Sequence, residues 1–309
     1  MKKYLVSISG PTGIGKTDWA VRLARHYQTE VLSADSRQFY REMCIGTAVP
    51  SPEELAAVPH HFIQHKSILE AYSVGDFRRD ALQRLKELFQ RHDLLILVGG
   101  SGLYLDAVTK GLDSFPKVAP EVREGLIKTY ESSGLGPLQE LLAEKDPKYH
   151  ARVDLSNPHR LIRALEVCLG SGKPYSSFLG NRKPPDFFSH LPLGIQADKE
   201  VVYERIGTRV DHMMEAGLLE EARGLLPYRA ETALQTVGYQ ELFAFLDGTW
   251  DLETAVEEIK KNTRRFAKRQ GTWLRRDPEI RWIPYDAPTE VAIRYIDSKT
   301  EEGNDGEGS

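Results

Sequence analysis

The segment GPTGIGKT, residues 10–17, constrains the fold of this chain more than any other part of the sequence. It follows an apolar run, precedes a helical pattern and matches GxxxxGK[ST], in which backbone N–H groups surround phosphate oxygens at the start of a helix. Lys16 adds positive charge, and the Thr17 hydroxyl is suited to bind Mg²⁺. The motif predicts a site for a diphosphate-like group, as in ATP-binding and other nucleotide-binding proteins, without specifying its organic part. The residues of this predicted site are Gly10, Pro11, Thr12, Gly13, Ile14, Gly15, Lys16 and Thr17.

Strand and helix signals alternate over the first hundred residues. Apolar runs at 4–9, 30–34 and 94–98 predict strands, and helical patterns at 16–27 and 77–90 separate them. This alternation predicts an α/β fold, with a P-loop-containing parallel sheet flanked by helices. Each predicted strand is followed by a cluster of glycine and polar residues. GPTGIGKT follows the first strand, DSRQFY the second and GGSGLY the third. Because ligands bind at the carboxyl ends of parallel strands, we expect the three clusters to face one crevice.

The alternation stops between residues 112 and 186, where Gly and Pro residues separate helical signals. We expect this segment to form an inserted all-helical domain, and residues 1–111 and 187–298 to form the α/β core. The tail, residues 299–309, is acidic and lacks large apolar groups, so we expect it to be disordered. Further helices are predicted at 120–133, 138–145, 158–169, 199–216, 232–246 and 252–275, and a further strand at 191–197.

The composition excludes several classes of protein. No apolar run approaches the roughly 20 residues of a membrane-spanning helix, so no membrane association is expected. Cys44 and Cys168 form no CxxC pair, which argues against a zinc module or a disulfide framework and indicates a cytoplasmic protein. The net charge of −4 hides a basic run at 260–276, with eight cations and no acid. That run either attracts phosphate or forms a solvated helix face.

Asp35 is the acidic residue of the predicted crevice. A nucleotide hydrolase needs an acid at the end of a later apolar strand, but the strand at 94–98 ends in Gly99 and Gly100. The nearest acid at a strand end is Asp35. Its carboxylate could organise Mg²⁺, act as general base for a nucleophile beside the phosphate, or cap the following turn. The residues themselves leave these three roles open.

Other polar residues are candidates for binding the rest of a substrate. Arg205 and Arg209 stand at i and i+4, and either clamp a diphosphate from the side opposite the loop or form an ordinary surface pair. Ser101 either hydrogen-bonds a substrate or accompanies glycines that let the strand pass close to the loop. In the insertion, Arg160 and Arg163 give one predicted helix a basic side suited to a nucleic-acid backbone.

Taken together and in order, the motifs resemble those of the tRNA dimethylallyltransferases, the bacterial isopentenyl-tRNA transferase family. The matching words are GPTGIGKT, SADSRQFY, IGTA, GDFRRDAL, LVGGSGLY, NPHRLIRALEV, RIGTRV, QTVGYQE and TRRFAKRQGTWLRR, spread over residues 4–283. The phosphate loop occurs in a vast superfamily, whereas SADSRQFY, IGTA and RxxKRQxTWLR in this order are highly specific. The resemblance implies transfer of a dimethylallyl group from dimethylallyl diphosphate to the exocyclic amine of the adenine just 3′ of the tRNA anticodon, giving N6-isopentenyladenosine.

The resemblance also implies roles for individual residues. Lys16, Thr17, Asp35 and Arg209 are the implied catalytic residues. The phosphate loop binds the diphosphate with Thr17 on Mg²⁺, and Arg209, together with Arg205, neutralises the leaving group. Asp35 takes the proton of the amine, after the adenine has left its stack in the anticodon loop. The residues implied to line the RNA path are Asp35, Ser36, Arg37, Gln38, Ser101, Arg123, His159, Arg160, Leu161, Ile162, Arg163, Gln235, Thr236, Val237, Gly238, Tyr239 and Gln240.

The expected partners are dimethylallyl diphosphate and the tRNA anticodon stem-loop, and the absence of a strongly apolar stripe favours a monomer.

Ser101 stands where Thr is more usual, His159 where Gln is frequent, and Val49 where Lys often follows IGTA. Ser101 keeps the hydroxyl, and the other two affect individual RNA contacts. Alternatives are an adenylate isopentenyltransferase, which prenylates free nucleotide, and a P-loop small-molecule kinase. The insertion and the basic run favour tRNA over both, and the intact phosphate loop beside Asp35 argues against a non-enzymatic RNA-binding module.

Overall fold

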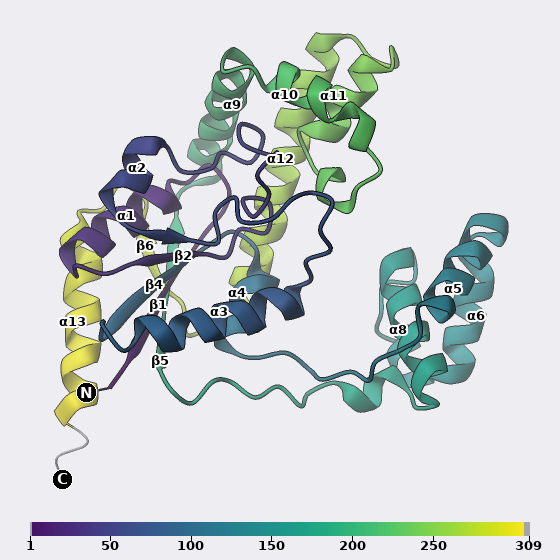
Figure 1. Ribbon diagram of the computed structural model, residues 1–309, viewed down its shortest axis with the longest axis horizontal. Helices are drawn as coiled ribbons and strands as arrows, with labels where there is room; N and C mark the ends of the chain where they lie inside the picture. The colour runs from purple at the N-terminus through teal and green to yellow at the C-terminus, as the bar shows by residue number, and fades with distance from the viewer. Residues whose placement is uncertain (1, 306–309) are drawn as a thin grey trace. The chain divides into compact units, whose positions relative to one another are not determined.

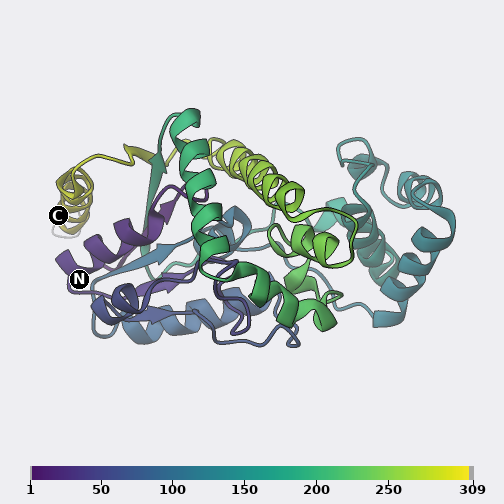
Figure 2. The ribbon, with the colours of Figure 1, turned by 90° about the horizontal axis from the view of Figure 1, so that it is seen from above.

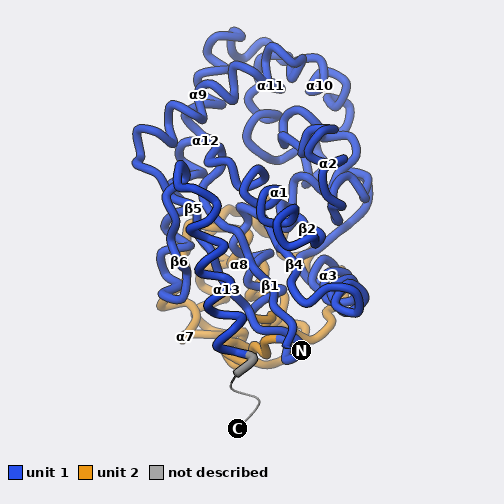
Figure 3. The backbone as a smooth tube through the Cα atoms, turned by 90° about the vertical axis from the view of Figure 1, so that its left-hand side faces the viewer, with its two compact units in different colours: residues 1–109, 185–309 blue, residues 110–184 orange. Residues whose placement is uncertain are grey.

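The structure, a computed structural model, describes residues 2–305, which divide into two compact units (Figure 3). Unit 1 comprises Met1–Thr109 and Pro185–Ser309, and unit 2 comprises Lys110–Pro184. Unit 1 contains a parallel sheet flanked by helices, and unit 2 is helical. The fold class expected from the sequence is therefore confirmed.

The described residues of unit 1 form one six-stranded parallel sheet with the order β3-β2-β4-β1-β5-β6 (Figure 1). β1 lies near its centre, where Tyr4 pairs with Leu94 of β4 and with Ser189 of β5. All residues of β1 and β4 are buried, as expected for a parallel sheet covered on both faces. The strands are β1 (Tyr4–Ser9), β2 (Val31–Ser33), β3 (His60–His61), β4 (Leu94–Val98), β5 (Ser189–Gln196) and β6 (Arg281–Pro284).

Alternate residues of β1 contribute to two separate cores, because side chains of a strand point to opposite faces. Val6 belongs to a cluster with side chains of α1 and α13, whereas Leu5 belongs to a cluster with side chains of α3 and α4. These helices therefore cover the two faces of the sheet (Figure 1). The helices of the first half, with the C-terminal one, are α1 (Lys16–His26), α2 (Pro52–Ala57), α3 (Val74–Leu88), α4 (Gly102–Thr109) and α13 (Thr289–Asp305).

A second group of helices follows β5 in unit 1. α12 packs against both α9 and α11 (Figure 2). The single helix predicted over 232–246 was wrong in its first half, because Gly238 has a φ of 101° and interrupts the helical backbone. A 3-10 turn at Thr232–Leu234 therefore precedes a shorter helix. This group consists of α9 (Lys199–Glu215), α10 (Leu218–Leu225), α11 (Tyr239–Leu246) and α12 (Leu252–Leu274), with a 3-10 turn at Leu226–Tyr228.

The acidic tail differs from the expectation of disorder. α13 continues to Asp305, so residues 299–305 are helical, whereas residues 306–309 lie outside the described part. The helix is anchored to the core of unit 1, because Ile296 is fully buried and the Tyr4 hydroxyl donates to the Thr300 carbonyl oxygen at 3.3 Å. The prediction of disorder used the acidic composition alone, which contains no information about this anchoring. The tail residues thus extend a helix that is already held in place.

Unit 2 is a helical unit with its own small core. A proline stands in the first turn of each helix, where the missing N–H costs no hydrogen bond. Asn157 caps α8 by accepting the Arg160 N–H at 3.2 Å. Leu126, Leu142 and Leu165 are among the buried side chains that these helices share. The elements are α5 (Pro120–Ser133), α6 (Gly136–Lys145), α7 (Pro147–His150), α8 (Pro158–Ser171) and a 3-10 turn at Tyr175–Phe178.

Candidate functional site

The phosphate loop joins β1 to α1 at the carboxyl end of a central strand. Gly13 and Gly15 have φ angles of 80° and 96°, in the left-handed region that favours glycine. Lys16 Nζ donates to the Pro11 carbonyl oxygen at 2.9 Å, and Arg205 Nε donates to the Gly13 carbonyl oxygen at 2.9 Å. Two cations therefore lie against the loop where a diphosphate is expected to bind.

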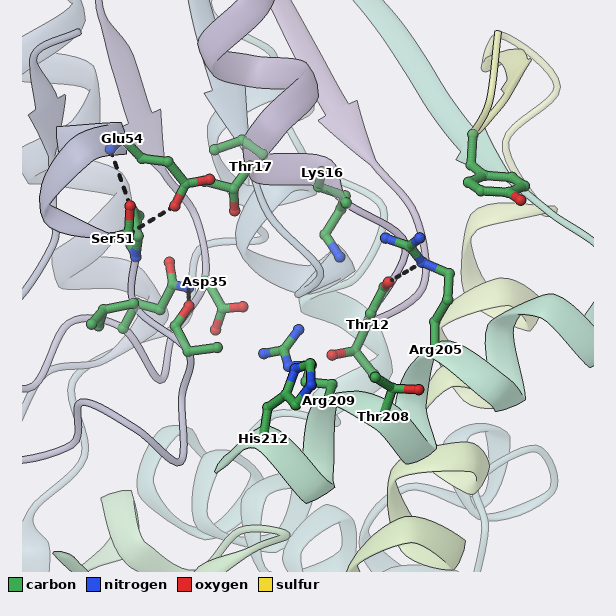
Figure 4. A pocket seen from close by; sticks show the side chains of 18 of the residues that line it. Thr12, Lys16, Thr17, Asp35, Ser51, Glu54, Arg205, Thr208, Arg209 and His212 are labelled. Carbon is green, nitrogen blue, oxygen red and sulfur yellow. Dashed lines mark hydrogen bonds between the residues drawn. The ribbon is translucent and has the colours of Figure 1, made fainter. Parts of the chain in front are cut away.

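Asp35 lies just after β2, at the same edge of the sheet. Its Oδ1 accepts the backbone N–H of Arg37 at 3.1 Å, so the carboxylate does cap the turn that follows it. Figure 4 shows, however, that Asp35, Lys16 and Arg209 also point toward one common space. A carboxylate and two cations therefore converge from the end of β2, from α1 and from α9.

Two cavities share these side chains. The loop cavity, of about 780 Å³, is lined by the phosphate loop, by α9 and by residues 48–51 (Figure 4). The strand-end cavity, of about 230 Å³, is lined by residues that follow β2 and β4 and by α12. Thr12, Lys16, Asp35 and Arg209 line both cavities. A group bound in one cavity can therefore meet a group bound in the other at these four side chains.

Burial and charge act together on the cations of the site. Burial lowers the pKa of Lys16 from 10.5 to about 8, while the Asp35 carboxylate opposes this shift and Arg209 adds to it. Burial also lowers the pKa of Arg209, again against the effect of Asp35. A guanidinium nevertheless stays protonated in proteins. A bound anion would favour the charged form of Lys16 and so raise its pKa again.

Arg205 and Arg209 share one face of α9, and both line the loop cavity. This placement favours a diphosphate clamp over an ordinary surface pair. Arg209 is half-buried and reaches both cavities, whereas Arg205 is exposed. Thr208 and His212 also line the loop cavity from α9, although no role for them was predicted from the sequence (Figure 4).

Gln270 of α12 is a site residue that the sequence motifs did not identify. Its Oε1 accepts the Thr12 N–H at 2.9 Å, and its Nε2 donates to the Gly100 carbonyl oxygen at 2.7 Å. The side chain is only 8% exposed. Gln270 thus joins the phosphate loop to the end of β4. The word TRRFAKRQGTWLRR marked its segment, but helical periodicity cannot indicate a partner 258 residues away in the chain.

The strand-end cavity gathers many of the residues expected on the RNA path. The hydroxyl oxygens of Ser36 and Ser101 lie 3.4 Å apart, and Arg37 Nη1 donates to the Ala233 carbonyl oxygen at 2.8 Å. These side chains come from the ends of β2 and β4 and from the turn before α11. The expected RNA-path residues that line this cavity are Asp35, Ser36, Arg37, Ser101, Thr236, Val237 and Gly238.

Four expected RNA-path side chains are buried, one of them Gln38 at 8% exposure. Contact of these four residues with RNA stays a prediction. Tyr239 is fully buried, and its hydroxyl donates to Glu221 Oε1 at 2.7 Å. In unit 2, Leu161 is 0% exposed and Ile162 is 5% exposed, because both pack into the core of that unit. Family words mark a segment, but they do not distinguish its packing residues from its surface residues.

Other predicted residues take supporting positions. The Ile14 side chain is buried in the core, so only its backbone can reach a diphosphate. Gln38 lines the loop cavity, and its Nε2 donates to the Ala48 carbonyl oxygen at 2.9 Å. Gln235 and Gln240 are exposed and hydrogen-bond to each other at 2.7 Å, outside the lining of both cavities.

Unit 2 carries the remaining basic residues of the predicted RNA path. Arg123 Nη1 lies 2.9 Å from Glu166 Oε2, and Arg163 Nη1 lies 3.3 Å from Glu166 Oε1. His159 and Arg160 are exposed at the start of α8. Their accessibility is compatible with RNA contact, which stays a prediction for these residues.

Within residues 2–305, no helix is long and apolar enough to cross a membrane. The same residues contain no group of three or more His, Cys, Asp or Glu side chains placed to hold a metal ion.

Known proteins are similar to this chain over nearly its whole length. The family described as IPP transferase matches residues 38–277. A curated relative, the tRNA dimethylallyltransferase of Christiangramia forsetii, is 57% identical over 97% of this chain and 99% of its own length. The solved tRNA isopentenylpyrophosphate transferase of Bacillus halodurans is 36% identical, with a TM-score of 0.75 over 100% of both chains. A solved eukaryotic dimethylallyltransferase acting on tRNA is 25% identical, with a TM-score of 0.77, over 92% of this chain and 74% of that one.

Proposed function

Since the chain belongs to the IPP transferase family, we propose that it is a tRNA dimethylallyltransferase. The family match confirms the resemblance drawn from the sequence motifs. The donor is dimethylallyl diphosphate, and the acceptor is the exocyclic amine of the adenine on the 3′ side of the tRNA anticodon. The product is N6-isopentenyladenosine.

The observation that carries this proposal is the junction between the two cavities. The loop cavity contains the phosphate loop with Arg205, which suits an organic diphosphate. The strand-end cavity contains Ser36 and Ser101, whose hydroxyls suit the polar edge of a base. Lys16 and Asp35 border both cavities, so an anionic leaving group and an attacking amine can meet there. A nucleotide hydrolase has no need of the second cavity.

The donor side of the reaction is a departure of diphosphate. As the amine nitrogen forms a bond to the allylic carbon, the bond between that carbon and the diphosphate oxygen breaks. The electron pair of this bond leaves with the diphosphate. Lys16 and Arg209 are positioned to stabilise the additional charge, in surroundings buried enough to lower the pKa of both. Their contribution is greatest in the transition state, where the charge develops.

The acceptor side of the reaction requires the loss of a proton from the amine. Asp35 is the carboxylate that borders both cavities, so it accepts the amine proton as the new C–N bond forms. The hydrogen bond from the Arg37 N–H to Asp35 Oδ1 fixes the orientation of the carboxylate. The cap of the turn and the catalytic base are therefore compatible roles of one side chain.

Mg²⁺ fits the donor side through Thr17. The Thr17 hydroxyl lines the loop cavity at the start of α1, where the phosphate-loop motif provides a magnesium ligand. Mg²⁺ usually keeps several waters and binds one or two protein groups together with phosphate oxygens, so a single hydroxyl suffices. When bound, the ion supplies charge neutralisation of the diphosphate.

On the tRNA side, the adenine leaves its stack at a cost of about a few kcal/mol, which contacts to the loop recover. The exposed His159 and Arg160 of unit 2 supply such contacts to the anticodon stem-loop. All four side chains at the junction come from one chain, so a monomer is sufficient for the reaction.

The experiment that tests this function uses labelled dimethylallyl diphosphate, Mg²⁺ and unmodified tRNA. We expect prenylated adenosine to form in the tRNA without ATP. Label on free AMP in place of tRNA would identify an adenylate isopentenyltransferase. A strict requirement for ATP would contradict prenyl transfer altogether and favour a kinase.

A further inference from the structure

A third cavity, of about 410 Å³, lies apart from the site described above. Its walls come from α9 and α12, from the end of β5 and from β6. Pro11 borders it from the phosphate loop, but no residue that lines it also lines the loop cavity or the strand-end cavity. The reaction proposed above gives this cavity no task.

The third cavity uses a different face of α12 from the strand-end cavity. Phe266 and Gln270 line the strand-end cavity, whereas Lys268, Gly271 and Arg275 line the third cavity. A helix turns by about 100° per residue, so the side chains of Lys268 and Arg275 point at least about 140° away from those of Phe266 and Gln270. A ligand in the third cavity is therefore distinct from the substrate groups at the junction.

The charged side chains in the lining are all cations. Lys199 enters from α9, and Lys268 and Arg275 enter from α12. Among residues 2–305, no aspartate or glutamate lines the cavity to neutralise them. All three side chains are exposed, and three cations from two helices at one cavity are an arrangement suited to a phosphate group.

Apart from Gln196, the remaining lining is mostly apolar and aromatic. Tyr203 and Trp282 contribute rings, and Val202 and Ala267 contribute buried aliphatic surface. Lys199 Nζ lies 5.3 Å from the centre of the Tyr203 ring, so one cation sits beside the aromatic wall. Such a wall suits a flat, weakly hydrated ring system, because aromatic faces stack on bases without regard to sequence.

We propose that the third cavity binds a single nucleotide, with its phosphate on Lys268 and Arg275 and its base against Trp282 and Tyr203. The volume lies within the range of small-molecule pockets and suits one nucleotide unit. The same chemistry has two possible sources, a free mononucleotide or one nucleotide of the bound tRNA. The proposal goes beyond prenyl transfer and can be tested without it.

The test measures binding of AMP to the full chain by equilibrium dialysis. Inorganic pyrophosphate and Mg²⁺ are present at saturation, so that the phosphate loop is occupied. We expect one equivalent of AMP to bind in the third cavity, in addition to any AMP whose adenine enters the strand-end cavity. The Lys268→Ala/Arg275→Ala double variant should lose at least about 100-fold in affinity, since it removes two charged hydrogen bonds and each accounts for about tenfold or more. Arg276→Ala, next in sequence but outside the lining, should bind AMP as the parent does.

A second test fills the third cavity with a larger side chain and leaves its charged residues in place. A Cβ on Gly271 would have only the Arg275 side chain within 4 Å, at 3.7 Å, so Gly271→Leu occupies the cavity without striking backbone. This variant should abolish the equivalent of AMP that depends on Lys268 and Arg275. Gly224→Leu in α10 is the matched control, because a Cβ there meets nothing within 4 Å.

Two results would overturn the proposal. One is the loss of all AMP binding once pyrophosphate occupies the phosphate loop. The other is equal affinity for inorganic phosphate and AMP, which would leave the aromatic wall without a role. Displacement of AMP by the anticodon stem-loop would support an RNA nucleotide as the ligand, whereas undisturbed AMP binding would support a free nucleotide.

Discussion

Burial and substrate charge act in opposite directions on the Lys16 ammonium. Without an anion nearby, burial holds its pKa at about 8, and its Nζ donates to the Pro11 carbonyl oxygen at 2.9 Å. A diphosphate in the loop would favour the charged form. Donor binding and protonation of Lys16 are therefore coupled.

This coupling predicts how donor affinity depends on pH. The pKa of Lys16 is lowered, so the charged form prevails below about pH 8 and is lost above it. We expect the affinity for dimethylallyl diphosphate, measured by calorimetry, to fall as pH rises through 8. Lys16→Arg keeps its charge and should bind with little change over the same range, because a guanidinium does not lose its proton. If the donor affinity of Lys16→Arg fell equally above pH 8, the titrating group would be a residue other than Lys16.

Gln270 provides a second test at the residue scale. Gln270→Leu leaves the Thr12 N–H and the Gly100 carbonyl oxygen without their partner. We expect the free energy of unfolding to fall by about 1–3 kcal/mol and the KM for the donor to rise, because the phosphate loop loses its support. Gln240→Leu, at an exposed glutamine, should change neither quantity. A loss of stability with an unchanged KM would make Gln270 a packing residue only.

At the scale of elements, the segment after β2 depends on α10 and α11. The Glu221 carboxylate of α10 accepts the N–H groups of Cys44, Ile45 and Gly46 at 3.0, 2.8 and 2.9 Å. It also accepts the hydroxyl of the buried Tyr239. This network holds a wall of the strand-end cavity, because Gly46 lines that cavity.

The closeness of Gly46 to Tyr239 leads to a prediction about this network. A Cβ on Gly46 would lie 2.6 Å from the Tyr239 hydroxyl oxygen, and that ring is fully buried. Gly46→Ala should therefore cost about 1–3 kcal/mol of unfolding free energy in urea denaturation, as overpacking does. Gly125→Ala in α5 meets nothing within 4 Å, so we expect a gain of about 0.5–1 kcal/mol. Equal effects of the two substitutions would show that the ring moves freely.

The same elements show where prediction from sequence succeeds and where it stops. β1 and β4 were predictable because a strand covered on both faces is a continuous apolar run. The phosphate loop and Asp35 were predictable because each follows such a run. The break before α11 depends on one backbone angle at Gly238, and the Glu221 network joins distant segments. The periodicity of apolar residues contains no information about single backbone angles or about contacts between distant segments. The helix α10, the role of Gln270 and the burial of Tyr239 could therefore be found only in the structure.

At the scale of the whole molecule, the chain leaves unit 1 at Thr109 and returns to it at Pro185. Unit 2 is therefore tethered at both ends and has a core of its own. The junction of the two cavities lies wholly in unit 1. Donor binding and contact with RNA through unit 2 should consequently be separable by mutation.

Arg160→Ala tests this separation, because Arg160 is exposed at the start of α8. We expect the KM for tRNA to rise and the salt dependence of tRNA binding to become shallower by about one unit of slope, as for a lost phosphate contact. The affinity for dimethylallyl diphosphate should stay unchanged. Arg152→Ala, at another exposed arginine of unit 2, is the control. An unchanged salt slope in Arg160→Ala would exclude a phosphate contact at this position.

The most direct test of the account is a single-turnover measurement on Asp35→Ala, with donor and tRNA bound before the reaction is started by Mg²⁺. We expect the rate of prenyl transfer to fall by about 10²–10⁴-fold, the range of a lost general base, while the affinity for dimethylallyl diphosphate largely survives. A loss of donor affinity as large as the loss of rate would contradict the proposed base and make Asp35 an organiser of Mg²⁺.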